Sequence, residues 1–299
     1  MSAVELEPGF IGDRYRLDRH IARGGMAEVW LGHDTFLDRQ VAIKVLKRHI
    51  ARDETSIERF RREALACAGL NHPNIVAVYD SFAHDGFPVV VMQYVQGRSL
   101  RDLLDKKRKL TPGLSIMMGA AIASALDATH QHGYIHRDIK PGNIFLDSRG
   151  QPKLADLGLA RPTSGADMTM PGMVVGTPAY IAPEQARAVA DLDIRADVYA
   201  LGATLFHLVA GHPPYPGDDP MGVIVAVLND PLPDLAAVAQ GCPAEVAWLA
   251  RSLMAKDRNE RPANARRRSA RRPTCSTARD DPRRSRRSRR QPRRRRRHR

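Results

Sequence analysis

The stretch HRDIKPGN at residues 136–143 places an acid, a base and an amide close together. Asp138, Lys140 and Asn143 are two and three residues apart, which suits neither one face of a helix nor one face of a strand. We therefore expect an irregular loop. There Asp138 can accept a proton from a hydroxyl group, Lys140 can neutralise a phosphate, and Asn143 can hold Mg²⁺ through its amide oxygen.

A second acid follows in LADLGLA at residues 154–160. Asp156 stands between apolar runs, and Gly158 permits a turn beside it. Two oxygen ligands near a lysine suit phosphoryl transfer, in which catalysis consists mostly of positioning and charge neutralisation.

Lys44, in VAIK at residues 41–44, has apolar neighbours in a strand-like run. A lysine that faces a cleft there needs a carboxylate partner, whereas an exposed strand lysine needs none. In the helix expected at 56–69, Glu63 lies at the edge of the apolar stripe and is the glutamate placed to reach inward. We predict an ion pair between Lys44 and Glu63.

Adjacent glycines, Gly24 and Gly25, interrupt two strand-like runs in IARGGMAEVWLG at residues 21–32. This pattern predicts a hairpin whose backbone can approach a ligand closely. A purely structural hairpin is the alternative.

The remaining periodicity predicts an α+β fold. Residues 15–95 are mostly strand-like with one helix, whereas 112–133 carry a 3.6-residue apolar stripe and 198–210 read as a buried helix. A small β-rich lobe therefore precedes a larger helical lobe, and sites often form between such units.

Net charge separates the body from a tail. The chain carries +14, but residues 263–299 hold 18 arginines and 2 aspartates, so the remainder is close to neutral at −2. The tail has no Leu, Ile, Val, Met, Phe, Trp or Tyr. It cannot bury apolar surface against the cost of ordering, so we expect disorder.

The three cysteines, Cys67, Cys242 and Cys275, are far apart and indicate neither a disulfide framework nor a zinc site. The start of the chain lacks the features of a signal peptide, and no uncharged apolar stretch approaches the roughly 20 residues that span a bilayer. We expect a cytoplasmic protein without a membrane segment.

The order of these motifs resembles the protein-kinase signature set, with APE at 182–184, DVYALG at 197–202 and ERP at 260–262 completing it. GGMAEV, NHPNIV and GTPAYIAPE are most similar to the bacterial Hanks-type (eukaryotic-like) serine/threonine protein kinases. The resemblance covers about residues 13–262.

It implies a bilobal protein-kinase fold, with a small β-rich N-lobe containing one helix and a larger helical C-lobe. The expected divisions are an N-terminal extension (1–12), the N-lobe (13–95), the C-lobe (96–262) and the disordered Arg-rich tail (263–299).

The resemblance also implies a nonspecific serine/threonine protein kinase that uses ATP with Mg²⁺ or Mn²⁺. Lys44 would hold the α- and β-phosphates and pair with Glu63, and Asp138 would deprotonate the substrate hydroxyl. Lys140 would contact the γ-phosphate. The implied metal ligands are Asn143 and Asp156.

The resemblance assigns the nucleotide to the hairpin and the junction of the lobes. Ala22, Gly24 and Gly25 match the loop that covers the phosphates, although Ala22 replaces its first glycine and would restrict the turn if φ were positive. Adenine would lie between Val29, Ala42 and Phe145. Its backbone partners would be Gln93, Tyr94 and Val95, beside the gatekeeper Met92.

Three further roles follow from the resemblance. Glu184 would pair with Arg261, and Asp197 would brace the catalytic loop. Arg137 would meet a phosphate on the activation segment at 156–184, after autophosphorylation by a second copy of the chain. The candidates are Thr163, Ser164 and Thr169, of which position favours Thr169. Lys140, with Thr177, indicates serine/threonine specificity.

Two other readings stay open. A catalytically weak or inactive kinase-fold protein is one, although the lysine, both aspartates and Asn143 are all present. The other is tethering to nucleic acid, because 18 arginines in the tail would bind phosphate backbones with steep salt dependence. An altered reading frame would also explain this tail.

Overall fold

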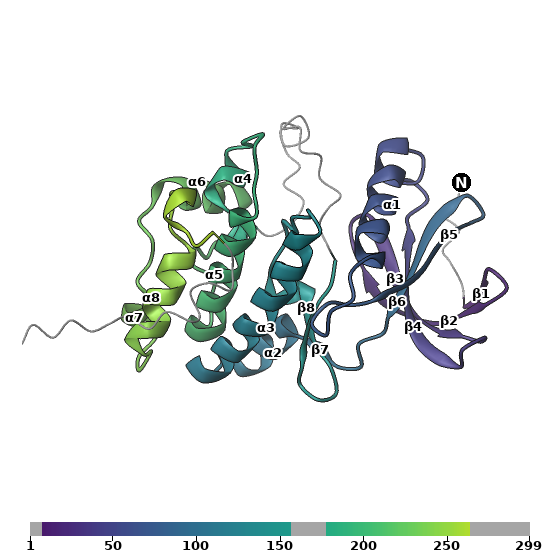
Figure 1. Cartoon of the computed structure of the whole chain (residues 1–299), viewed down its shortest axis with the longest axis horizontal. Coiled ribbons are helices and arrows are strands. Elements are labelled where there is room, and N and C mark those ends of the chain that lie inside the picture. Colours follow the sequence, from purple (N-terminus) through teal and green to yellow (C-terminus); the bar gives the residue numbers. More distant parts are fainter. Residues whose placement is uncertain (1–7, 157–177, 264–299) are drawn as a thin grey trace, which may run out of the picture.

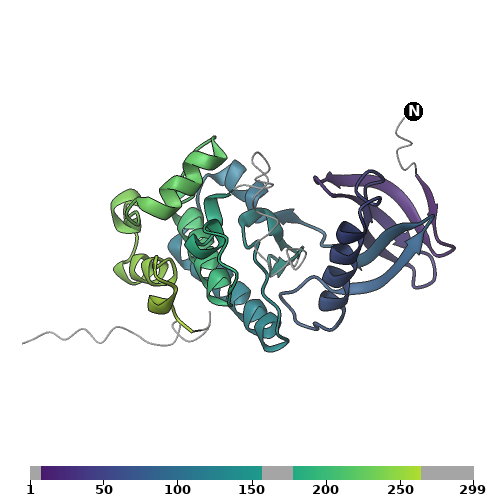
Figure 2. The same ribbon diagram turned by 90° about the horizontal axis from the view of Figure 1, so that it is seen from above.

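The computed structural model describes residues 8–156 and 178–263, and it has two lobes (Figures 1 and 2). The first lobe is an antiparallel sheet in the order β1-β2-β3-β4-β6-β5 with the helix α1 (Glu54–Ala68) against it. The strands are β1 (Gly9–Ile11), β2 (Tyr15–Arg23), β3 (Ala27–Asp34), β4 (Arg39–Leu46), β5 (Val78–His84) and β6 (Phe87–Gln93). The α+β, bilobal prediction is confirmed. Residues 9–11, which lie in the expected N-terminal extension, form β1, one of the two edge strands of this sheet.

Alternating side chains give the sheet two apolar faces. One face is a cluster that includes Trp30, Ile43 and Val91, and the other packs Val90 against Phe60 of α1. Successive side chains of a strand point to opposite faces, so each strand contributes apolar residues to both clusters. In the resulting register, Lys44 lies opposite Val29 on β3 and Val90 on β6.

The second lobe is built around α5 (Arg195–Ala210), whose residues 196–209 are all buried. A helix that is apolar on every side is stable only inside a core. The other helices of this lobe come before and after α5 in the chain. They are α2 (Leu100–Lys107), α3 (Pro112–Gln131), α4 (Pro183–Ala186), α6 (Pro220–Asn229), α7 (Leu235–Val238) and α8 (Ala244–Leu253). None of the helices in the two described ranges is both long and apolar enough to cross a membrane.

Two segments of the chain hold the lobes together. Residues 94–97 link β6 to β7 (Arg98–Ser99), and a Cβ atom at Gly97 would lie 1.7 Å from the Leu146 carbonyl oxygen, so this position requires glycine. After α1, the Asn74 side chain donates to the Pro152 carbonyl at 2.8 Å, and Val76 N–H donates to Leu154 at 2.9 Å. The strands β8 (Ile144–Leu146) and β9 (Pro152–Leu154) thus hold the base of the first lobe in place.

Candidate active site

A buried carboxylate holds the loop that contains HRDIKPGN. Asp197, at the start of α5, accepts the backbone N–H groups of His136 at 2.8 Å and Arg137 at 2.7 Å. His130 of α3 also contacts it through Nε2 at 2.8 Å. Because these N–H groups bond to a side chain and not to a regular ladder, the loop keeps an irregular path without leaving buried donors unsatisfied. The predicted bracing contact is present.

Asp138, Lys140 and Asn143 converge within this loop. Lys140 Nζ lies 2.8 and 3.0 Å from the two carboxylate oxygens of Asp138. The Asn143 side-chain nitrogen donates to the Asp138 carboxylate at 2.9 Å and to its carbonyl at 2.8 Å. The Asp138 side chain is 49% exposed, so an incoming hydroxyl group can reach it. The Asn143 amide oxygen is the atom of that side chain left for a cation.

His136 supports the same loop from inside. Its imidazole is fully buried, and burial lowers its pKa, so the ring is neutral. Nδ1 accepts the backbone N–H of Asp138 at 3.3 Å and Nε2 donates to the Ala155 carbonyl at 3.2 Å. The ring therefore fixes Asp138 relative to the residue before Asp156.

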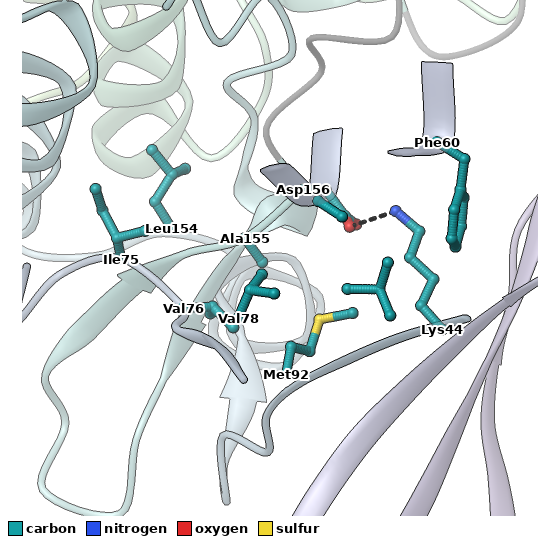
Figure 3. Close-up of a pocket in the computed structure, with 11 residues that line it drawn as sticks. Lys44, Phe60, Ile75, Val76, Val78, Met92, Leu154, Ala155 and Asp156 are labelled. Carbon is teal, nitrogen blue, oxygen red and sulfur yellow. Dashed lines mark hydrogen bonds and ion pairs between the residues drawn. The ribbon is translucent and has the colours of Figure 1, made fainter. Parts of the chain in front are cut away.

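The two lobes face each other through an ion pair (Figure 3). Lys44 of β4 contacts Asp156 with 2.9 Å between Nζ and Oδ1, and the ammonium lies 6.0 Å from the centre of the Phe60 ring. The Lys44 ammonium lowers the pKa of the Asp156 carboxyl. The Asp156 side chain is 48% exposed, so the pair is accessible to a charged ligand.

Asn143 and Asp156 are adjacent because Ala155 N–H donates to the Asn143 carbonyl at 2.9 Å. One carboxylate and one amide oxygen are hard ligands of the kind that Mg²⁺ and Mn²⁺ prefer, and Mg²⁺ usually keeps several waters besides. The donor set therefore fits a divalent cation.

Comparison with known proteins agrees with this geometry. The sequence-family model of the protein kinase domain matches residues 15–270 of this chain. This chain belongs to the protein kinase domain family. It is 46% identical over 223 residues to a probable serine/threonine-protein kinase, SCO3848, of Streptomyces coelicolor (73% of this chain, 33% of that protein). It is 41% identical over 261 residues to the serine/threonine-protein kinase PknB of Mycobacterium tuberculosis (85% and 41%).

The solved kinase domain of Mycobacterium tuberculosis PknI has a TM-score of 0.70 and 31% identity, covering 88% of this chain and 96% of that one. The chain thus matches solved kinase domains almost end to end, but it spans only 33–41% of the length of the two curated relatives above. The predicted bacterial Hanks-type family is confirmed, and membership implies use of ATP and a divalent metal.

In the kinase domain, the glycine-rich hairpin joins β2 and β3. Gly24 N–H donates to the Ala27 carbonyl at 2.9 Å, and a Cβ at Gly25 would meet nothing within 4 Å. Ala22 pairs with Val29 in the ladder, and its φ is not positive. The replacement of glycine by Ala22 therefore does not strain the turn, because this alanine lies in β2 with an ordinary strand φ.

The expected adenine residues lie on both sides of the cleft. Ala42 pairs with Met92, and Phe145 is in β8 of the other lobe. The Gln93 N–H donates to the Ala77 carbonyl at 2.8 Å, so Gln93 would meet a nucleotide through its carbonyl oxygen. Contacts of Tyr94 and Val95 with adenine stay predictions. Behind Met92 is a small cavity that the sequence did not reveal, lined by Phe60, Ala64, Ile75, Val76, Val78 and Leu154, among others.

Several expected residues lie outside what the structure describes. The backbone of Glu63 is in α1, but its side chain is not described, so its pairing with Lys44 stays a prediction. Thr163, Ser164, Thr169 and Thr177 lie in the segment 157–177, and the Arg-rich residues 264–299 are likewise outside the described ranges.

Two positioning residues were not found from the sequence. Gln185, just after APE, donates to the Arg137 carbonyl at 3.2 Å. His130 of α3 contacts Asp197 and was not among the expected site residues. Both contacts join residues at least 48 positions apart, and no local pattern in the chain points to them.

Proposed function

We propose that this kinase domain transfers the γ-phosphoryl group of ATP to serine and threonine hydroxyl groups of proteins. The observation that carries the proposal is the convergence of Asp138, Lys140 and Asn143 opposite the Lys44–Asp156 pair. Cations and oxygen ligands thus surround one accessible carboxylate, as transfer of a highly charged group requires.

Each side chain has a task that its chemistry permits. Asp138 orients the acceptor hydroxyl and takes its proton. Lys140, 2.8 Å from that carboxylate, supplies positive charge where the γ-phosphate passes. Lys44, with Glu63 as its expected partner, would exchange its contact with Asp156 for the α- and β-phosphates, and the hairpin of Ala22, Gly24 and Gly25 would cover them.

Asn143 and Asp156 would hold the divalent cation, Mg²⁺ or Mn²⁺. When bound, the cation neutralises charge on the phosphate oxygens. Adenine would lie between Val29, Ala42 and Phe145, with the backbone of Gln93, Tyr94 and Val95 at its edge.

The test is transfer of labelled γ-phosphate from ATP to the chain itself and to a generic basic protein. We expect label on phosphoserine or phosphothreonine, dependent on added Mg²⁺ or Mn²⁺. Label on tyrosine would refute the specificity, and a well-folded chain that labels nothing would refute the activity.

Autophosphorylation in trans is part of the proposal, with Thr169 as the favoured acceptor. An Asp138→Asn chain cannot label itself, so label that appears on it after mixing with the parent chain requires an encounter between two copies. Label confined to the parent would contradict this. Because ATP is a substrate, we expect the domain to face the cytoplasm.

A second property is favoured by the composition of residues 263–299, whose 18 arginines would bind nucleic acid by charge. Affinity for a mixed-sequence duplex should fall steeply as salt is raised, and removal of residues 263–299 should abolish it. Equal binding by the shortened chain would reject this role.

A further inference from the structure

Four consecutive basic residues lie at the end of α2 on the surface of the C-lobe. Lys106 and Lys107 end the helix, and Arg108 and Lys109 form the turn that follows it. All four are exposed, and none of them forms an ion pair with a residue that the structure describes. We call residues 106–109 the basic turn. Three of the eight lysines of the chain lie in it.

The carboxylates of α2 are engaged elsewhere. Asp102 accepts the backbone N–H of Ser99 at 2.9 Å and its hydroxyl group at 2.8 Å, and so caps the start of the helix. Asp105 pairs with Arg101, with 3.0 Å between Oδ1 and Nε. The helix dipole favours cations in the last turn of a helix, which accounts for the first two residues of the basic turn. It does not account for the last two, which lie beyond the helix.

The backbone of the basic turn is held in an unusual conformation. Arg108 has a φ of 63°, in the left-handed region that favours glycine, and its N–H donates to the Leu104 carbonyl at 2.6 Å. Leu110 N–H donates to the Leu208 carbonyl of α5 at 2.7 Å, and a Cβ at Gly211 would lie 2.9 Å from the Arg108 carbonyl oxygen. Strained residues other than glycine gather at functional sites, which points to a use for the Arg108 side chain.

The other end of α2 lies beside the catalytic loop. Ser99 pairs with Phe145 in the ladder of β7 and β8, two residues after Asn143. The short 3-10 helix η1 (Pro141–Asn143) contacts α2 directly. The eight residues of α2 span about 12 Å. An extended polypeptide adds up to about 3.5 Å per residue, so a flanking segment of a substrate chain can extend from Asp138 to the basic turn.

The composition of the basic turn favours carboxylates over phosphates as its ligands. Arginine binds phosphate through two parallel hydrogen bonds and is preferred for nucleic acids, whereas lysine is a compact point charge. This chain is rich in arginine, yet lysine predominates here. Residues 1–262 carry −2 overall, so a long polyanion or a membrane surface would also meet acidic neighbours. A short acidic run of a polypeptide fits a positive charge confined to four residues.

We propose that the basic turn binds an acidic segment of the protein substrate, a run of aspartate or glutamate residues separate from the acceptor serine or threonine. This inference rests on the proposed kinase activity and names a feature of its substrates. Because exposed ion pairs carry the contact, binding should weaken as salt is raised.

The kinetic test uses two peptides that share one acceptor serine and differ in a flanking run, which is glutamate in one and glutamine in the other. With the full chain we expect a KM about tenfold lower for the glutamate peptide, since several exposed ion pairs together give a factor of this order. The KM for ATP should not change in the variant that removes the four charges, whereas the preference for glutamate should be lost. That variant combines Lys106→Gln, Lys107→Gln, Arg108→Gly and Lys109→Gln.

A matched control removes four charges elsewhere on the surface. The arginines chosen are exposed and form no ion pair within the two described ranges. This control should keep the preference of the parent chain, which separates a local site from general attraction by charge. Thermal unfolding should show that both variants are folded. The control combines Arg19→Gln, Arg52→Gln, Arg149→Gln and Arg251→Gln.

Acetylation of lysine locates the contact directly. Residues 263–299 contain no lysine, so the reaction reports on the rest of the chain even if the tail also attracts acidic peptides. We expect the glutamate peptide to protect Lys106, Lys107 and Lys109 and to leave Lys47 unprotected, as read by mass spectrometry. A mixed-sequence DNA duplex and vesicles that contain phosphatidylserine are the rival probes.

The inference is overturned if the glutamate peptide leaves the three lysines unprotected, or if the variant of the basic turn keeps the preference of the parent. Stronger protection by the duplex or by the vesicles also overturns it, and would assign the basic turn to nucleic acid or to a membrane surface. A parent chain that phosphorylates neither peptide refutes the proposed function. A parent with equal KM values for the two peptides overturns this inference alone.

Discussion

The cleft and the interior of the C-lobe each contain a lysine or arginine paired with a carboxylate, but the two pairs differ in geometry and in exposure to solvent. In the C-lobe, Arg261 binds Glu184 through two nitrogens, at 2.5 and 2.8 Å, with the side chains 0% and 8% exposed. In the cleft, Lys44 meets Asp156 through one contact, with exposures of 16% and 48%.

Their surroundings differ in the same direction. The Arg261 guanidinium also donates to the carbonyls of Ala255 at 2.7 Å and Arg195 at 2.9 Å, so its donors are used within the protein. The cleft pair joins two lobes across an opening. A closed pair can only hold the fold together, whereas an open pair can exchange partners with a phosphate or a metal ion.

The largest effect on stability should follow from breaking the closed pair. Arg261→Ala leaves the Glu184 carboxylate buried without its partner, which costs about 3–5 kcal/mol of the free energy of unfolding. Urea denaturation measures this loss. Replacing both residues, as Arg261→Met with Glu184→Leu, should recover much of it. A loss below about 1 kcal/mol for Arg261→Ala would mean that the closed pair is not structural.

Breaking the open Lys44–Asp156 pair should affect activity much more than stability. Lys44→Met should lower the rate of phosphate transfer about a hundredfold, because it removes fixed positive charge from the transferring group. The free energy of unfolding should change by less than about 1 kcal/mol, since a partly exposed pair contributes little. Both quantities are measured on one preparation.

Lys47→Met serves as the matched control, because Lys47 is a partly exposed lysine just after the same strand. It should leave the rate unchanged. A Lys44→Met chain that transfers phosphate normally, or that unfolds as readily as Arg261→Ala, would remove the distinction between the two pairs.

The smallest expected effect is the pH dependence of stability that comes from titration of Asp156. Lys44 lowers the pKa of Asp156 below its ordinary value of 3.8. A depressed pKa in the folded state adds stability above pH 3.8, which is lost as the pH falls through the folded-state value. Because Asp156 is half exposed, we expect the gain to stay below about 1 kcal/mol.

Comparing unfolding of the parent and Asp156→Asn between pH 6 and pH 2 tests this, as the variant should show a flatter dependence below about pH 4. A parallel curve for the two chains would mean that Asp156 does not titrate with folding.

The sequence predicted these regions unequally. Segments with a strong apolar pattern, such as α3 and the buried α5, were predicted nearly to their ends, because that pattern is a local signal. Motif order placed Asp138, Asn143 and Asp156 in one site. The sequence did not reveal the hydrogen bond between Gln185 and the Arg137 carbonyl, or the one between the Tyr180 hydroxyl and His207. Both depend on how segments far apart in the chain pack together.

The most direct test of the account is the single-turnover rate of phosphate transfer by Asp138→Asn compared with the parent chain, after matched ATP affinity and thermal unfolding have been verified for both. Asparagine keeps the shape of the side chain but cannot take the proton, so the account predicts a rate lower by about a thousandfold. A folded, ATP-binding Asp138→Asn chain that transfers phosphate at the parent rate would contradict it.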